Sequence, residues 1–155
     1  MKIQARINWL PAIAAISLLA LPATGFAKQE VWMLATSSIK GTSHSRTLFF
    51  HDKNITSLDA CREEIQRGYI NQWRYYNPPS GRSISAGESI NFRCAYSHTT
   101  PQRWIRSAPY SFTYMVQIQQ NTLNLVPQIN YADCMRNTNS SQQDFCTASS
   151  QKVNL

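Results

Sequence analysis

The sequence predicts an α+β domain: a small antiparallel sheet of about four strands, with one long helix packed on a face and disulfide bonds as staples. Three observations predict this class. Two segments alternate cleanly between apolar and polar residues, as half-buried strands do. One segment has the apolar spacing of an amphipathic helix, and all four cysteines follow the N-terminal apolar run. Helix and strand signals are segregated along the chain, which favours α+β over α/β.

The first 27 residues have the pattern of a secretory signal peptide. A positively charged start precedes an apolar run at residues 10–21, which is too short to span a bilayer. Small residues stand where a cut after Ala27 requires them. We therefore expect residues 1–27 to be removed. Residues 28–155 then form a single exported domain, periplasmic or extracellular, without stable membrane insertion and with a polar, loosely ordered C-terminal tail.

The first elements of this domain are expected to be two strands and a helix. Residues 31–38 (VWMLATSS) and 47–51 (TLFFH) are rich in apolar and β-favouring side chains. Thr56 or Ser57 can cap the helix that follows. The helix should run to about Trp73 and end before the prolines beyond it. Its apolar face consists of Leu58, Cys61, Ile65 and Tyr69.

The middle of the chain predicts a hairpin. Residues 89–97 (SINFRCAYS) and 110–120 (YSFTYMVQIQQ) alternate, so we expect two strands joined by a long connection at residues 98–109. A further short strand is expected at 123–126 and a helical turn at 131–136.

Four cysteines allow three pairings, and an exported domain favours disulfides. Cys61 lies on the apolar face of the expected helix and Cys94 on the apolar face of an expected strand. A helix packed on a sheet would bring these faces together, so we favour a Cys61–Cys94 bridge. Cys134 and Cys146 would then close a polar loop locally. A metal site is the rival interpretation, but it needs closely spaced thiolates such as C-x2-C, and the sequence has none.

Positive charge is concentrated in the middle of the domain. Without the signal peptide the chain has 13 basic and 8 acidic side chains, a net charge of +5. Residues 62–106 contain seven arginines and three acids. Arginine binds carboxylates and phosphates in a bidentate manner and stacks on aromatic rings. The alternative is that the aromatic residues pack in the core and the arginines form a solvated rim. The candidate binding residues are Trp73, Arg74, Tyr75, Arg93, Arg103, Trp104 and Arg106.

The segment 101–109 (PQRWIRSAP) is the most informative part of this region. Two prolines bracket a Trp-Ile pair that has an arginine on each side. Trp104 either folds back on the sheet as a cap or stands exposed between Arg103 and Arg106, and the sequence leaves both alternatives open.

The sequence offers little for catalysis. His44, His51 and His98 are its three histidines, and the HDKN run that begins at His51 is too short to be specific. There is no P-loop, dinucleotide glycine pattern or G-x-S-x-G motif. We therefore predict no catalytic residue, cofactor or metal.

The sequence is compatible with three classes of function. The first is a binding module for an anionic partner: an envelope polymer, a nucleic acid or an acidic protein patch. The alternative is an accessory or structural subunit of a cell-envelope assembly, and the third class is a small hydrolase. The sequence does not indicate an oligomeric state.

Overall fold

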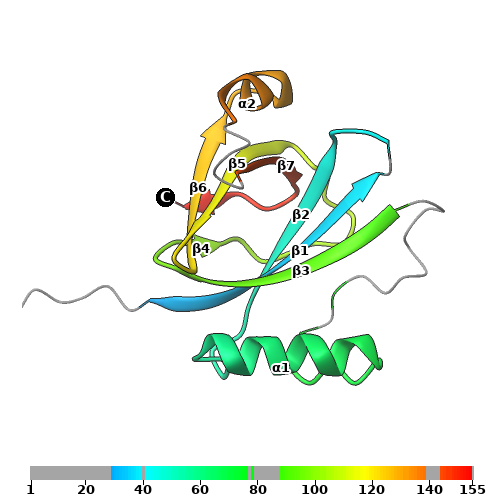
Figure 1. Cartoon of the computed structure of the whole chain (residues 1–155), viewed down its shortest axis with the longest axis vertical. Helices are drawn as coiled ribbons and strands as arrows, with labels where there is room; N and C mark the ends of the chain where they lie inside the picture. Colours follow the sequence, from blue (N-terminus) through cyan, green and yellow to red (C-terminus); the bar gives the residue numbers. More distant parts are fainter. Residues whose placement is uncertain (1–28, 40, 77, 79–87, 139–143, 155) are drawn as a thin grey trace, which may run out of the picture.

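A computed structural model describes residues 29–39, 41–76, 78, 88–138 and 144–154, so the expected signal peptide lies outside the described residues. Within them the chain forms eight strands and two helices (Figure 1). In chain order these are β1 (Glu30–Ile39), β2 (Ser45–His51), α1 (Leu58–Tyr69), β3 (Glu88–Ser97), β4 (Thr100–Pro101), β5 (Phe112–Gln119), β6 (Thr122–Gln128), α2 (Tyr131–Asn137), β7 (Phe145–Ser149) and β8 (Val153–Asn154).

Six of these strands form a closed barrel in the order β1-β2-β7-β5-β6-β3, and β4 and β8 form a separate two-stranded sheet. The predicted fold, an α+β layer of about four strands with one long helix, is therefore wrong: the protein is mostly β. The barrel closes through two parallel pairings. One joins β2 to β7 at Arg46 and Ala148, and the other joins β3 to β6 at Tyr96 and Thr122. Contacts between such distant strands leave no local pattern in the sequence.

β1 explains how the barrel is built, because both of its faces are buried. Trp32 and Leu34 point into the barrel, and Val31 and Met33 point out toward α1. All four side chains are at most 1% exposed. The apolar run VWML therefore serves two cores, one inside the barrel and one between the barrel wall and α1.

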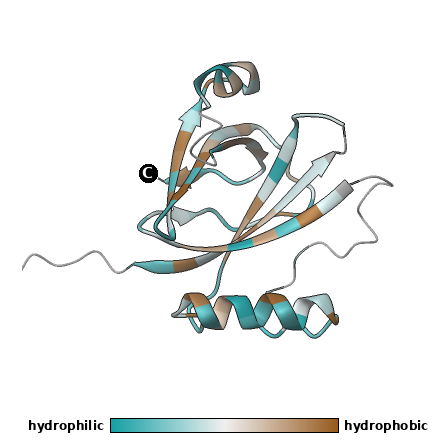
Figure 2. Cartoon of the chain, viewed as in Figure 1, coloured by the Kyte–Doolittle hydropathy of each residue, from teal (hydrophilic) through white to brown (hydrophobic). Residues whose placement is uncertain are grey.

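Helix α1 covers the outer face of β1 and β3 (Figure 1). Figure 2 shows apolar and polar residues mixed along it, as expected of an amphipathic helix. Ser57 is the N-cap, and its hydroxyl accepts a hydrogen bond from the Ala60 backbone N–H. The helix ends at Tyr69, one turn earlier than predicted, and Asn71 adopts a positive φ of 58° just beyond it.

The predicted hairpin of residues 89–97 and 110–120 is not formed. β3 pairs with β1 and β6, whereas β5 pairs with β6 and β7. The hairpin that does form is β5–β6, and its turn contains Gln120 and Asn121, both with positive φ. The segment between β3 and β5 is therefore a crossover between different parts of the barrel.

The structure contains the two disulfides that the sequence analysis favours. Cys61–Cys94 joins α1 to β3, and Cys134–Cys146 joins α2 to β7. Each bridge thus ties a helix to the outside of the barrel wall. Disulfides persist in oxidising environments, so they indicate a location outside the cytoplasm.

The last described residues are partly buried. Val153 pairs with Pro101 in the β4–β8 sheet and is 5% exposed. Its backbone N–H donates to the hydroxyl of Tyr114, inside the barrel. The sequence predicts a loosely ordered tail in this part of the chain, and its described residues pack at one end of the barrel.

Candidate binding site

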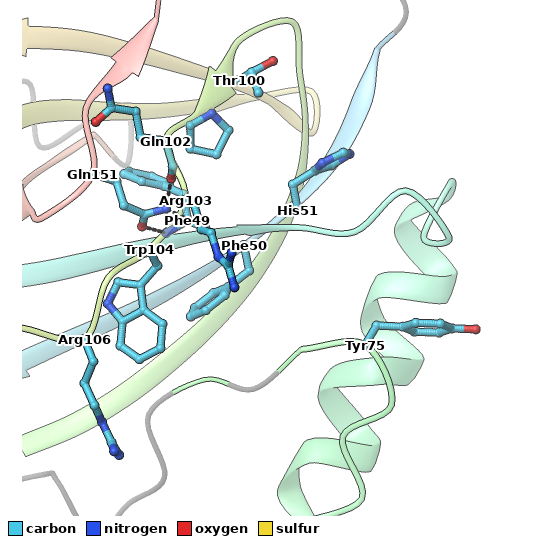
Figure 3. A pocket seen from close by; sticks show the side chains of 11 residues that line it. Phe49, Phe50, His51, Tyr75, Thr100, Gln102, Arg103, Trp104, Arg106 and Gln151 are labelled. Carbon is cyan, nitrogen blue, oxygen red and sulfur yellow. Dashed lines mark hydrogen bonds between the residues drawn. The ribbon is translucent and has the colours of Figure 1, made fainter.

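A cavity of about 660 Å³ forms an open groove between the end of β2 and the segment that follows β4 (Figure 3). We call it the β2 groove. Four of the seven predicted binding residues line it: Tyr75, Arg103, Trp104 and Arg106. The remaining lining residues are Phe49, Phe50, His51, Thr100, Pro101, Gln102 and Gln151.

Gln151 holds one wall of the groove against the other. Its side-chain amide exchanges two hydrogen bonds with the backbone of Phe49: Oε1 accepts from the N–H at 2.7 Å, and Nε2 donates to the carbonyl at 2.8 Å. Nε2 also donates to the Gln102 carbonyl at 2.8 Å. The Gln102 N–H in turn donates to the Lys152 carbonyl. A single buried side chain therefore fixes the segment that carries Arg103 and Trp104 to the edge of β2.

Trp104 is half-buried, between the two alternatives that the sequence left open. Its ring contacts Phe50 edge-on, with the ring centroids 6.0 Å apart. Phe50 is backed by the buried Tyr76, at a centroid distance of 6.1 Å. The indole is thus held on one side by an aromatic cluster and open to the groove on the other.

The groove has a positive character. The exposed Arg103 lies beside Phe50, and the exposed Arg106 extends past the Trp104 ring (Figure 3). No carboxylate is among the described residues that line the groove. At its edge, His51 Nε2 lies 3.4 Å from a carboxylate oxygen of Glu30. Two arginines therefore line a groove that also has aromatic walls.

Tyr75 stands at the rim opposite Trp104, on the chain that follows α1 (Figure 3). The buried Glu64 holds this chain. Its Oε1 accepts hydrogen bonds from the backbone N–H groups of Arg74 (2.5 Å), Tyr75 (2.7 Å) and Tyr76 (3.5 Å). The Arg74 guanidinium lies over the Tyr75 ring, 6.0 Å from its centroid. Arg74 is thus next to the groove without lining it.

The structure places the last two predicted binding residues elsewhere. Trp73 packs on Phe92 with a centroid distance of 5.5 Å and covers Gly68 of α1, so it belongs to the core under the helix. Arg93 lies over the ring of Phe145, 5.4 Å from its centroid, in a different cavity.

Sequence reasoning missed Phe50, Gln151 and Glu64. Phe50 is predicted only as part of a strand. Its position near the end of that strand was the one sign that it could line a groove. Gln151 fell in a segment expected to be frayed. Glu64 has no predicted role, yet it is 2% exposed. No local pattern marks Gln151 or Glu64, because each acts on backbone groups at least ten residues away.

Two tyrosines next to the groove have altered acidity. Burial raises the pKa of the Tyr76 phenol well above its usual range, and the negative charges of Asp52 and Glu64 raise it further. Burial also raises the pKa of Tyr114, partly offset by the hydrogen bond from the Val153 N–H. Both hydroxyls stay protonated near neutral pH and are unsuited to act as bases. Across the described ranges, no three His, Cys, Asp or Glu side chains gather as a metal site would require.

Comparison of the chain with protein-family models, with curated proteins and with solved structures finds no match. In the described part of the chain, neither helix has the length and apolar character needed to cross a membrane. The candidate function therefore depends on the groove itself.

Proposed function

We propose that the protein is an exported binding module, and that the β2 groove binds an anionic polymer with flat groups. The observation that supports this most directly is that Arg103, Arg106 and Trp104 all line one open groove. Guanidinium groups attract phosphate or carboxylate along a polymer backbone, and aromatic faces stack with bases or sugar rings.

The geometry of the groove supports this proposal in a second way. Its walls are pre-positioned, because Gln151 fixes the arginine-bearing segment and Glu64 fixes the Tyr75 rim. Pre-organised side chains lose less conformational entropy on binding. The disulfides and the signal-peptide pattern fit a protein that works in the periplasm or outside the cell.

The test is a salt-titrated binding assay with residues 28–155, using two fluorescent probes: a 12-nucleotide single-stranded oligothymidylate and heparin. We expect binding that weakens steeply with salt. In the Arg103→Gln/Arg106→Gln variant the slope of log K against log salt should be shallower by about 1.4 for the oligonucleotide, because about 0.7 is lost per phosphate contact.

The matched control is Arg62→Gln/Arg136→Gln, which removes the same charge from exposed positions on α1 and α2. This variant should bind both probes nearly as the parent does. Equal weakening by the two double variants, or binding that does not depend on salt, would contradict a role for the groove. The probe that binds tighter identifies the polymer class.

A second candidate function, an accessory subunit of an envelope assembly, is favoured by the edge of β3. Among the described strands, β3 pairs along its whole length with β1 but meets β6 only at Tyr96 and Thr122. Although the barrel is closed, the rest of this side of β3 has no described strand partner, and such a stretch can accept a strand from another chain. Light scattering coupled to gel filtration distinguishes this candidate, which requires a stable complex that Arg103→Gln/Arg106→Gln leaves intact.

A further inference from the structure

A second cavity, of about 420 Å³, lies at one mouth of the barrel and is separate from the β2 groove. Its inner wall continues the inward-facing rows of β1 and β3, where Thr36, Ser38 and Asn91 replace the apolar residues of the barrel core. The outer wall comes from the α2 region and the start of β7. Mouths of β-barrels are common sites for small ligands, and this volume is in the usual range.

The floor of this mouth cavity is sealed by hydroxyl groups. The Thr36 Oγ1 lies 2.9 Å from the Thr47 Oγ1, which lies 2.8 Å from the Thr147 Oγ1. These hydrogen bonds cross from β1 to β7 above the apolar core. The floor of the mouth cavity is therefore hydrogen-bonded, and the cavity is not a gap in the core packing.

Two opposite charges line the mouth cavity without pairing. Arg93 is exposed, and its guanidinium lies over the Phe145 ring. Asp144 is 8% exposed. Asp144 Oδ2 accepts a hydrogen bond from Gln117 at 2.8 Å, while Oδ1 is buried without a hydrogen-bond partner in the described structure. Within the described residues no ion pair joins Arg93 to Asp144 or to another acid.

An unpartnered buried carboxylate oxygen is costly, and so calls for a donor. Arg93 offers N–H donors that suit a carboxylate. The walls between them include apolar surface from Phe145 and Met135. We propose that the mouth cavity binds a small zwitterion, a free amino acid with an apolar side chain. Its carboxylate pairs with Arg93, its ammonium group donates to Asp144, and its side chain packs on Phe145.

The experiment is isothermal titration of residues 28–155 with L-phenylalanine, L-leucine and L-methionine, repeated with N-acetyl-L-phenylalanine and L-phenylalaninamide. We expect saturable binding of at least one free amino acid. The two phenylalanine derivatives each lack one charge and should bind at least tenfold more weakly than L-phenylalanine. Amide shifts in the nuclear magnetic resonance spectrum should centre on residues 36–38, 89–93 and 144–146.

Arg93→Gln and Asp144→Asn should each weaken amino-acid binding at least tenfold. Asp144→Asn keeps an oxygen for the hydrogen bond from Gln117, and an unchanged melting temperature confirms that the fold is retained. Arg103→Gln is the matched control, because it alters the β2 groove and should leave amino-acid binding unchanged. The polymer assay above tests the β2 groove separately, so either site can fail alone.

Three outcomes would overturn the proposal: no saturable binding of any of the three amino acids, equal binding of the N-acetyl derivative, or unchanged binding in Arg93→Gln. Equal binding of N-acetyl-L-phenylalanine would reassign the mouth cavity to simple carboxylates, with Asp144 outside the site.

Discussion

At the scale of single residues, Glu64 is a charged-type residue on a helix that nevertheless lies buried and holds the backbone of the following chain. Replacing it with alanine leaves the N–H groups of Arg74 and Tyr75 without their charged acceptor. We expect Glu64→Ala to lower the free energy of unfolding by about 2–3 kcal/mol, since hydrogen bonds to charged groups contribute this much.

Urea denaturation measures this effect. Glu63→Ala is the control, because the Glu63 side chain is 71% exposed and pairs only loosely with Arg67 at 3.9 Å. It should change the free energy by less than about 0.5 kcal/mol. A similar effect in both variants would mean that Glu64 acts through helix propensity or the helix dipole instead.

Tyr76 predicts how stability responds to alkaline pH. Its pKa is raised in the folded state, so the folded protein holds this proton more tightly than the unfolded chain does. Stability is fully retained below about pH 10, the pKa of an unperturbed tyrosine, and falls above it. The loss should approach about 1.4 kcal/mol per pH unit for one such group.

Denaturant titrations between pH 9 and pH 11.5 check this prediction. Tyr76→Phe should flatten the decline, and it also removes a buried hydroxyl that lacks a hydrogen-bond partner in the described structure. Tyr75→Phe changes a 40% exposed ring and serves as the control. A decline that is just as steep in Tyr76→Phe would assign the effect to other groups.

At the scale of elements, the fit between α1 and the chain that follows it depends on Gly68. A Cβ at this position would lie 2.0 Å from Trp73 Cζ2. Alanine in place of glycine normally stabilises a helix by about 0.5–1 kcal/mol, but overpacking of this kind costs about 1–3 kcal/mol. We therefore expect Gly68→Ala to destabilise the protein and to displace the Trp73 ring.

Near-ultraviolet circular dichroism detects the displaced ring, and urea denaturation gives the change in stability. Gln66→Ala, at an exposed position of the same helix, should leave both unchanged. A Gly68→Ala variant as stable as the parent, with an unaltered spectrum, would show that the Trp73 ring accommodates the added methyl group without a loss of stability.

Most elements of the first half of the fold are evident in the sequence, and their arrangement is not. The strands near residues 31–38 and 47–51 and the start of α1 follow from apolar spacing and capping. β7 (FCTAS) escaped prediction because five residues with little alternation and two polar side chains resemble a loop. Without β7 the barrel cannot be closed, and the β3–β5 hairpin becomes the simplest available interpretation.

The sequence likewise identifies part of the candidate site but not the residues that surround it in space. The segment with Arg103 and Trp104 stands out through its composition, but its neighbours in space are Phe50 and Gln151, from β2 and the C-terminal segment. Trp73 and Arg93 share that composition and face other surroundings, because composition does not specify which wall of the barrel a side chain reaches.

At the scale of the whole molecule, the two disulfides hold the helices to the barrel. The bridges join residues 33 and 12 positions apart. Loop-closure entropy predicts how much each bridge contributes to the free energy of unfolding. Removing Cys134–Cys146 by a pair of Cys→Ser substitutions should lower it by about 3 kcal/mol, and removing Cys61–Cys94 should lower it by about 1 kcal/mol more. Thermal unfolding of the two double variants tests the order. The reverse order would indicate that packing of α2 outweighs chain entropy.

The order of the cysteines along the chain has a consequence for how the protein reaches its native state. Each bridge joins two cysteines that are consecutive in sequence, and the two loops do not overlap. Suppose that the chain enters an oxidising compartment from its N-terminus. When Cys94 arrives, Cys61 is the one cysteine available to pair with it. When Cys146 arrives, the first pair has formed and Cys134 is the one cysteine still available. Oxidation in order of arrival produces the native pairs directly. Maturation should consequently need an oxidant but no disulfide isomerase, and so avoid the slow reshuffling that interleaved bridges require.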